Sequence, residues 1–385
     1  MHRIWKNISL VGVFALGSAG VSAQASTTVA RGRIASAAAV RVGVLAPLSG
    51  PSAVAGGDIV NAVKLAVANL NRARGVLGRP IVLDVQDSPC APQAAAQSAQ
   101  KLVADGVAAV VGPYCSSDAF AASAIFHRAG IAMVTPASTN PRLTQQGLNN
   151  IFRTIGRDDQ QGVFAAGLMV HTFHATRIAI IHDNGVYAKG LATATRDALS
   201  RYHGARVVFF DALTPGERDF SAILTNLRGV RPQVTYFTGY YADGGLLLKE
   251  FKQLGVSGQF MAGSANDDVT FIKLAGPSAG DAYVTTAPPP QMIPSAATFV
   301  RQFTTTYHRA PGPYAGYAYD AANVVVRAIA VARSTDPPAI VRALHATKDY
   351  PGITGPIAFT GTGDRAQFHY VVVTPRNGHF VPARL

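Results

Sequence analysis

Charged residues are scarce in this chain of 385 residues: Asp, Glu, Lys and Arg make up 14% of it, whereas hydrophobic residues make up 48%. Disordered chains have the opposite composition, so this balance excludes a largely disordered protein. The length is sufficient for two ordinary domains with a large buried core.

Long apolar runs are also missing, so no stretch after the first residues is expected to cross a membrane. The start of the chain is organised for export: a basic beginning precedes an apolar run over residues 8–19, and small residues over 21–25 offer an A-x-A-like cleavage site. No cysteine follows that run to carry a lipid anchor. We therefore predict a signal peptide over residues 1–25, a flexible leader over 26–39, and a soluble mature protein in the periplasm.

Cysteine is limited to Cys90 and Cys115. In an exported chain these two residues can form a disulfide that closes a loop of about 26 residues. Two buried free thiols are the alternative. A metal site is not expected from two cysteines without neighbouring histidines.

Acidic residues are few as well: 21 Asp and Glu stand against 34 Lys and Arg, which gives a formal net charge of +13. Loss of Arg3 and Lys6 with the signal peptide would leave +11. The basic residues are scattered and not interleaved with aromatic residues, which argues against nucleic-acid binding. The positive charge would attract anionic ligands or an acidic membrane partner over a long range. The alternative is that it serves only to keep the surface solvated.

Short apolar strands alternate with amphipathic helices in two consecutive sets, which indicates two parallel sheets covered by helices. The predicted strands are 42–46, 81–85, 108–111 and 131–134 in the first set, and 177–182, 205–210, 234–238 and 259–261 in the second.

From about residue 288 the pattern changes to two helices, over 296–307 and 315–333, followed by a β-rich tail over 357–381. The tail lacks the helices that a third sheet would need, so we expect it to complete the first two. The predicted fold is therefore α/β, with two Rossmann-like lobes joined by a hinge of several crossings. The predicted N-terminal lobe is 40–157 plus 288–363, and the C-terminal lobe is 158–287 plus 364–385.

Residues beyond the carboxyl ends of the strands are the candidates for ligand contact, because open parallel sheets bind ligands there. Ser116 and Thr139 follow two strands of the first set, where helices are expected to begin. Helix N-termini favour carboxylates, although Ser and Thr are also ordinary helix caps. Tyr187 and Tyr240 follow strands of the second set, where either ligand contact or packing would explain an aromatic residue.

Catalytic and metal-binding motifs are thin: there is no G-x-x-x-x-G-K phosphate loop and no H-E-x-x-H helix. His171 and His174 have no third candidate ligand close by and are interpreted as surface residues. The segment 361–364 is interpreted as a hairpin turn. A serine hydrolase built on Ser116 would need a nearby histidine, and His127 lies too far along the following helix. We therefore expect no catalytic residue, no metal and no cofactor.

Several segments together match one known family. They are Leu48–Pro51, Gly112 with Cys115-Ser116-Ser117, Thr135–Thr139, Arg177–Asp183, Val208–Asp211 and Gly239-Tyr240. With them, the chain from about residue 41 to its C-terminal strands resembles the periplasmic leucine/isoleucine/valine-binding proteins, the type I solute receptors of branched-chain amino-acid ABC transporters. The resemblance implies a monomeric type I periplasmic binding protein without enzymatic activity, a transporter permease as partner, and a disulfide between Cys90 and Cys115.

The resemblance also assigns the ligand site. It implies that Ser116 and Thr139 hold the ligand carboxylate and that the Ala137 carbonyl accepts a hydrogen bond from the ligand ammonium. Tyrosines of the second lobe would close over the ligand, and an aromatic residue would lie near its side chain. These tyrosines are Tyr187 and Tyr240, and the aromatic residue is Tyr314.

Ser264 departs from the family, which usually has a carboxylate at this position to pair with the ligand ammonium. Asp267 or Asp268 would have to reach in from nearby, and Ala55 stands where some members carry a tyrosine. An unpaired buried ammonium is costly. We therefore hypothesise that the residues that hold the ligand carboxylate are kept and that Ser264 still contacts the ligand. The ligand itself would have changed to an aromatic or other carboxylic acid without an ammonium.

The sequence thus predicts an extracytoplasmic solute-binding protein of an ABC transporter, which closes two lobes around an amino acid or a related small carboxylate. A ligand-sensing subunit of a membrane receptor is the alternative, since it would share the fold and the pocket.

Overall fold

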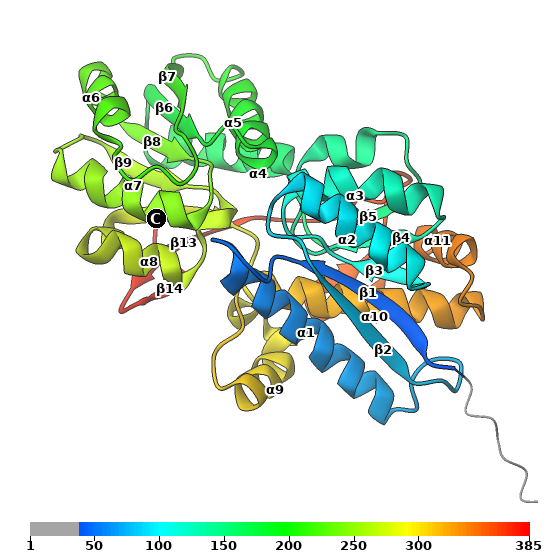
Figure 1. Ribbon diagram of the computed structural model, residues 1–385. Coiled ribbons are helices and arrows are strands. Elements are labelled where there is room, and N and C mark those ends of the chain that lie inside the picture. Colours follow the sequence, from blue (N-terminus) through cyan, green and yellow to red (C-terminus); the bar gives the residue numbers. More distant parts are fainter. Residues whose placement is uncertain (1–37) are drawn as a thin grey trace, which may run out of the picture. The chain divides into compact units, whose positions relative to one another are not determined.

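The computed structural model describes residues 38–385, which form two main β-sheets, each flanked by helices (Figure 1). The predicted signal peptide and nearly all of the predicted leader lie outside the described residues. The two helix-covered sheets confirm the predicted α/β class.

The first sheet has the strand order β2-β1-β3-β4-β5, and every neighbouring pair is parallel. β3 and β4 are short, mostly apolar strands in which every residue is buried, as expected for strands covered on both faces. Six helices contact this sheet or one another, and we call the whole group lobe 1. Its elements are β1 (Val40–Ala46), β2 (Ile81–Asp87), β3 (Ala109–Val111), β4 (Ala132–Thr135), β5 (Ile151–Arg153), α1 (Ala53–Arg72), α2 (Pro92–Ala104), α3 (Ser116–Arg128), α9 (Ala297–Tyr307), α10 (Ala315–Ala332) and α11 (Pro337–His345).

The second sheet has the order β14-β13-β10-β9-β8-β6-β7, with the last five strands parallel and β13 and β14 antiparallel at one edge. Helices α4 to α8 contact this sheet or one another, and we call this group lobe 2. Its elements are β6 (Arg177–His182), β7 (Arg206–Ala212), β8 (Val234–Phe237), β9 (Gln259–Ala262), β10 (Ala282–Thr286), β13 (Val371–Arg376), β14 (His379–Pro382), α4 (Asp158–Gly167), α5 (Val186–Leu199), α6 (Ser221–Val230), α7 (Tyr241–Gln253) and α8 (Val269–Ala275).

The chain passes from one lobe to the other after β5, after β10 and again before β13. A small hairpin of β11 (Tyr350–Gly352) and β12 (Gly355–Ile357) precedes the last crossing. The C-terminal tail therefore adds its strands β13 and β14 to the second sheet instead of building a third helix-covered sheet. The predicted turn over 361–364 is present, because Thr360 and Asp364 are joined by a backbone hydrogen bond of 2.8 Å.

The sequence pattern did not predict β5, β10, α8 and α11. β5 has only three residues, too few to show a period. α11 begins with two prolines, which resemble a loop in the sequence but fit the first turn of a helix. Its cap is Asp336, whose carboxylate accepts the N–H of Ala339 at 3.2 Å.

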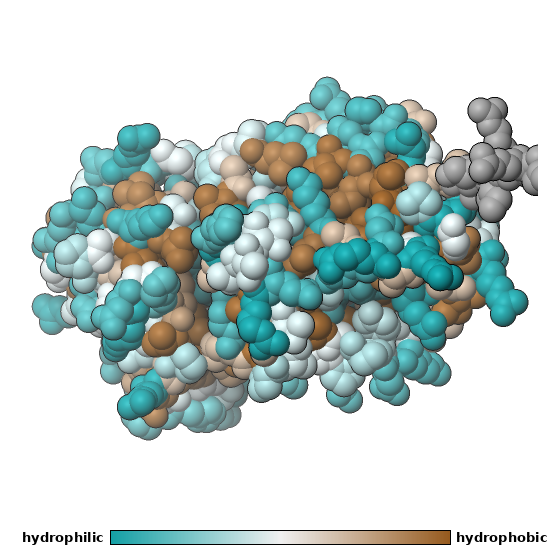
Figure 2. Space-filling view, turned by 90° about the horizontal axis from the view of Figure 1, so that it is seen from below, coloured by the Kyte–Doolittle hydropathy of each residue, from teal (hydrophilic) through white to brown (hydrophobic). Residues whose placement is uncertain are grey.

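Helix α1 is the one helix within residues 38–385 that is long and apolar enough to cross a membrane, which the sequence reading did not anticipate. More than half of its most apolar window is buried, and it packs against β1, β2 and α10. Its apolar face is therefore the face of a core helix. Figure 2 shows one face of the molecule, where hydrophobic residues gather in patches between hydrophilic ones.

Cys90 and Cys115 form a disulfide, with their Cα atoms 5.4 Å apart. The bridge ties the loop after β2 to the residue before α3. Asp118 in the first turn of α3 strengthens the same connection, because its carboxylate accepts the Ser88 hydroxyl and the Cys90 N–H.

We expect replacement of both cysteines by serine to lower the free energy of unfolding by about 3 kcal/mol, since the bridge removes the closure entropy of a loop of roughly 25 residues from the unfolded chain. Urea denaturation of the exported protein measures this difference. Wild-type protein unfolded in the presence of a reductant should match the double variant. Equal stability with and without the bridge would contradict the prediction.

Candidate ligand-binding site

The loop after β3 turns back sharply at Gly112. The φ angle there is +118°, and a Cβ atom would lie 2.0 Å from the Leu45 carbonyl oxygen, so only glycine fits. The turn brings Tyr114 and Ser116 to the carboxyl end of the first sheet, and Ser116 opens α3. The prediction of Ser116 at a helix beginning is therefore confirmed.

The loop after β4 is fastened to this turn by buried hydroxyl groups. Thr135 Oγ1 donates to the Pro113 carbonyl at 2.7 Å, and the Ser138 hydroxyl donates to the same carbonyl at 3.0 Å. As a result residues 137–140 run beside Ser116. The Ser116 hydroxyl oxygen accepts the backbone N–H of Asn140 at 3.4 Å.

A buried ion pair supports the same segment. Arg153 Nε lies 2.7 Å from the Asp364 carboxylate, and the two side chains are 0% and 5% exposed. The guanidinium also donates to the carbonyls of Ser138 and Asn140 at 3.0 and 3.2 Å. Arg153 therefore fixes the backbone on both sides of Thr139.

The loop after β6 places Tyr187 on the opposite wall, in lobe 2. The Asp183 carboxylate accepts the Gly185 N–H at 2.8 Å, and this Asx turn leads into α5, with Tyr187 in its first turn. The Tyr187 hydroxyl lies 3.3 Å from the Ser264 hydroxyl and accepts the Ala265 N–H at 3.3 Å. Tyr187 therefore follows β6, as the sequence predicted, and lies in the first turn of α5.

Ser264 is engaged inside lobe 2. Its hydroxyl donates to Gln161 Oε1 at 3.2 Å, and Gln161 donates in turn to the Thr285 carbonyl at 2.8 Å. The position where the family usually has a carboxylate is therefore occupied by a neutral hydroxyl whose hydrogen bonds are made within the lobe.

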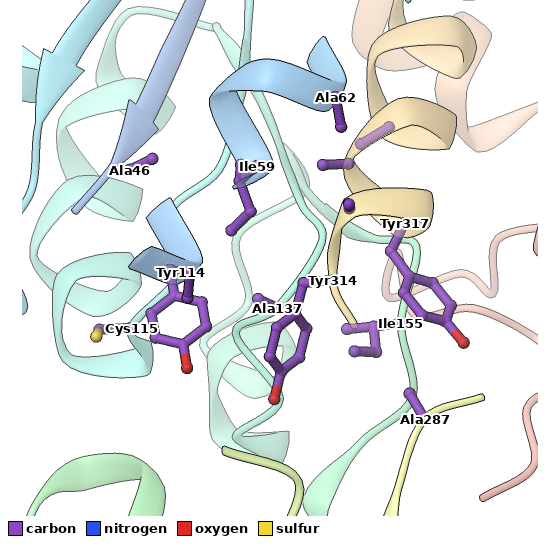
Figure 3. Packing of buried hydrophobic residues seen from close by; sticks show 14 of the residues in the cluster. Ala46, Ile59, Ala62, Tyr114, Cys115, Ala137, Ile155, Ala287, Tyr314 and Tyr317 are labelled. Carbon is purple, nitrogen blue, oxygen red and sulfur yellow. The ribbon is translucent and has the colours of Figure 1, made fainter. Parts of the chain in front are cut away.

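Residues of both lobes line a small cavity, which has a volume of about 10 Å³, close to the space of a single water molecule. The rings of Tyr114 and Tyr314 pack edge to face with centroids 5.3 Å apart, and Tyr240 lies 5.3 Å from Tyr187 and 6.0 Å from Tyr114. In Figure 3 the hydroxyls of Tyr114 and Tyr314 point in the same direction, toward the ribbons of lobe 2. The lining residues are Tyr114, Ser116, Ala137, Tyr187, Tyr240, Ala265 and Tyr314.

Thr139 and Ser264, the two other residues singled out by sequence, do not line this cavity. Thr139 is 2% exposed and stands just before a five-residue 3-10 helix, Pro141–Gln145, so the expected helix beginning at Thr139 is wrong. Tyr114 and Ala265 also line the cavity, although the sequence did not indicate them as site residues. Both stand next to singled-out residues in strand-end loops, and that adjacency was the signal that could have found them.

Several buried polar groups in the two lobes accept or donate no hydrogen bond, and one of them, the Tyr114 hydroxyl, belongs to a residue that lines the cavity. Among the described residues they include the hydroxyls of Tyr114 and Thr139, both carboxylate oxygens of Asp158, and Oδ2 of Asp267. Burial raises the pKa of Asp158 and of Asp267 to about 7 and that of Tyr114 well above its usual value. The junction of the two lobes therefore contains polar groups that a solute could satisfy.

The two acids expected to reach toward the Ser264 position differ in their surroundings. Asp268 caps α8, where its carboxylate accepts the Thr270 N–H at 2.7 Å. Asp267 is 5% exposed, and its burial raises its pKa to about 7 despite the opposing effect of the Thr286 hydroxyl at the end of β10.

Ser116 is not arranged as a catalytic nucleophile. It is 1% exposed, and His127 is an exposed residue near the other end of α3, about 16 Å along the helix axis. The segment 276–280 has a G-x-S-x-G sequence, but it forms a 3-10 helix after α8 instead of the strand–turn–helix of a nucleophile elbow.

The fold and the cavity define an α/β protein that can enclose a small solute between two lobes. A family profile described as periplasmic binding protein matches residues 39–379. The chain belongs to this family, and it is a solute-binding protein and not an enzyme.

Curated relatives agree with this assignment. The Leu/Ile/Val-binding protein BraC3 of Rhizobium johnstonii is 35% identical over 326 residues, which cover 84% of this chain and 88% of that protein. An amino acid binding protein of Pseudomonas aeruginosa is also 35% identical, over 86% of this chain and 89% of that protein.

Solved structures share the fold over most of the chain. The leucine-binding protein LivK of Thermotoga maritima superposes with a TM-score of 0.84 at 27% identity, covering 90% of this chain and 98% of that chain. LivJ of Streptococcus pneumoniae in complex with isoleucine superposes with a TM-score of 0.82 at 25% identity, covering 90% and 100%.

Hydrogen bonds outside the cavity also join the lobes. The Asn140 side-chain amide donates to the Val186 carbonyl at 2.8 Å, and the Tyr241 hydroxyl donates to the Pro51 carbonyl at 2.7 Å. Each bond joins a residue of lobe 1 to a residue of lobe 2, so each stabilises the closed arrangement.

We expect Tyr241→Phe to shift the balance between closed and open protein toward open by about two- to thirteen-fold, since a hydrogen bond of this kind contributes about 0.5 to 1.5 kcal/mol. Small-angle scattering of the solute-free protein should then give a larger radius of gyration. Tyr307→Phe is the matched control, because its hydroxyl donates to the Asn61 carbonyl at 2.9 Å within lobe 1. An unchanged radius in Tyr241→Phe would exclude the role in closure.

Proposed function

We propose that this protein captures a small carboxylate-bearing solute, with an aliphatic amino acid as the first candidate, between its two lobes and presents the closed form to the permease of an ABC transporter. The observation that carries the proposal is the cavity itself. Its walls combine Ser116 and Ala137 of lobe 1 with Tyr187 and Tyr240 of lobe 2.

The carboxylate would be held by the start of α3. Ser116 is the first residue of this 13-residue helix, whose first turn offers free N–H groups and partial positive charge. The hydroxyls of Ser116 and Thr139 would add hydrogen bonds to the same group. Charge-assisted bonds of this type are roughly twice as strong as neutral ones.

The tyrosines would enclose the rest of the solute. Tyr114 and Tyr314 come from lobe 1, and Tyr187 and Tyr240 come from lobe 2, so their rings would meet over the solute when the lobes close. Such rings bury apolar area with few rotatable bonds. Relatives named Leu/Ile/Val-binding proteins, at 31–35% identity over most of their length, support an aliphatic side chain.

The lobe boundaries that we propose for this closure are 40–157 with 288–363 for one lobe, and 158–287 with 364–385 for the other. The sheet memberships of β1–β5 and of β6–β10 with β13 and β14 support them. We also propose that the mature protein is monomeric and works in the periplasm, with residues 1–25 as its signal peptide, which fits its family.

A carboxylic acid without an ammonium is the second candidate for the solute. The neutral Ser264 favours it, because the hydroxyl makes its hydrogen bonds within lobe 2 and brings no negative charge to an ammonium. Calorimetry with leucine and with benzoate-like acids separates the two candidates, and tight leucine binding would exclude the second.

We expect Ser116→Ala to weaken solute binding by about 1 to 3 kcal/mol, because it removes a hydrogen bond to a charged group. Calorimetric titration with the amino acid that wild-type protein binds gives the difference. Ser117→Ala is the control, since the Ser117 hydroxyl donates to Asp118 at 3.1 Å and does not line the cavity. Unchanged affinity in Ser116→Ala would remove the carboxylate assignment.

A further inference from the structure

A groove with a volume of about 1030 Å³ lies at the junction of the two lobes, separate from the solute cavity. Lobe 1 contributes residues 120 and 140–142 to its wall, and lobe 2 contributes side chains of α4, of α5 and of the loop before α5. None of these residues lines the solute cavity. Because the two walls belong to different lobes, opening the lobes would move them apart, and the groove has this shape only in the closed arrangement.

Hydrophobic side chains of both lobes are exposed in the groove. Val163 of α4 is 47% exposed and Val186 of α5 is 42% exposed. Phe120 of α3 and Pro141 are half-buried in the opposite wall. A single exposed apolar side chain is ordinary at a protein surface, but apolar side chains that gather in one groove with a polar rim are typical of an interaction site.

The rim of the groove carries basic residues that are not neutralised. Arg142, Lys189 and Arg201 are exposed lining residues, and none of them lies within ion-pair distance of a carboxylate in residues 38–385. Lys189 Nζ donates to Asn184 Oδ1 at 3.2 Å, which is a neutral partner. All three positive charges are therefore available to another molecule.

The two acidic residues of the groove, in contrast, already have partners. The Asp159 carboxylate lies 2.7 Å from the Arg157 guanidinium, and the Asp197 carboxylate lies 3.3 Å from the Arg196 guanidinium. Neither of these arginines lines the groove. The groove therefore presents a positive potential, which is complementary to acidic groups on a partner.

The spacing of the basic residues indicates the size of that partner. α5 extends about 15 Å along its axis from Lys189 to its last residue, Leu199, and Arg201 follows the helix. One small anion can therefore contact only one of these two residues. An extended protein segment of about five residues covers the same distance, with acidic side chains near its ends and apolar side chains between them.

The groove shares two helices with the solute cavity. Phe120 lies four residues, about one turn, after Ser116 in α3, and Val186 directly precedes Tyr187 in α5. The Val186 carbonyl also accepts the cross-lobe hydrogen bond of Asn140 at 2.8 Å. Closure on a solute and assembly of the groove therefore involve the same helices.

We propose that this groove is the docking site for an acidic, partly apolar segment on the periplasmic face of the transporter permease. The inference rests on the proposed function, which supplies the permease as the partner, and it adds the surface and the chemistry of the contact. A permease that binds the assembled groove distinguishes the closed protein from the open one. By linkage, docking also stabilises the closed form.

Cross-linking tests the location. Val163→benzoylphenylalanine places a photoreactive group in the groove of the full-length exported protein, which is mixed with its cognate permease complex in liposomes. Illumination should link it to the permease when leucine is present at saturation, and much less without leucine. Val331→benzoylphenylalanine is the matched control, since Val331 is 52% exposed on α10 and lies outside the groove. It should form no such link.

Charge reversal tests the chemistry. Arg142→Glu, Lys189→Glu and Arg201→Glu together should raise the concentration of binding protein needed for half-maximal leucine uptake about ten-fold or more and reduce its dependence on salt, because charges at an interface rim control association. Calorimetric leucine affinity should change less than about two-fold, since these charges are exposed and screened. The control reverses three exposed lysines outside the groove: Lys64, Lys249 and Lys348.

The inference is overturned if the groove variant supports uptake as well as wild type, if the control variant loses uptake equally, or if positions 163 and 331 cross-link alike. Loss of leucine affinity in the groove variant would also overturn it, since the groove would then act in capture. Wild-type protein that binds leucine but neither cross-links to the permease nor supports uptake would overturn the transporter part of the proposed function as well. Solute capture would remain.

Discussion

The buried ion pair between Arg153 and Asp364 is the interaction on which the site depends most. Arg153 ends β5 in lobe 1, and Asp364 lies on the return path to lobe 2 before β13, so the pair ties two crossings of the chain together. The same guanidinium holds the carbonyls on both sides of Thr139. A buried guanidinium without its carboxylate would strongly destabilise the folded protein. The ion pair therefore stabilises the hinge and the wall of the site together.

The closed cavity contrasts with the polar loops that surround it. Hydrogen bonds of Thr135 and Ser138 fix the two lobe 1 loops of the site. These loops therefore need no further ordering when a solute binds. The four tyrosines, in contrast, pack against one another across the cavity. This packing buries the Tyr114 hydroxyl without a hydrogen bond. A solute that separates the rings therefore replaces contacts that leave polar groups unsatisfied with contacts that can satisfy them.

The sequence predicted the alternation of strands and helices because each buried strand is a short apolar run, and it indicated three of the seven lining residues because they follow those strands. Two others were assigned only by the family resemblance. It could not predict the supporting groups. Arg153 and Asp364 are 211 residues apart and belong to no local pattern. β5 is too short to show a period, so Asp158, which follows it, was not recognised as a strand-end residue. Such groups are defined only by three-dimensional proximity.

The position of Ser264 illustrates the same limit at the level of charge. A comparison of aligned positions shows only that a carboxylate is missing at position 264. The interaction energy of two charges depends on their distance, so a carboxylate from any part of the chain can act at the same place. Asp158 begins lobe 2 directly after the first crossing and is joined to Thr139 through its backbone. Asp158 is therefore placed by the same loop after β4 whose carbonyls the Arg153 guanidinium holds.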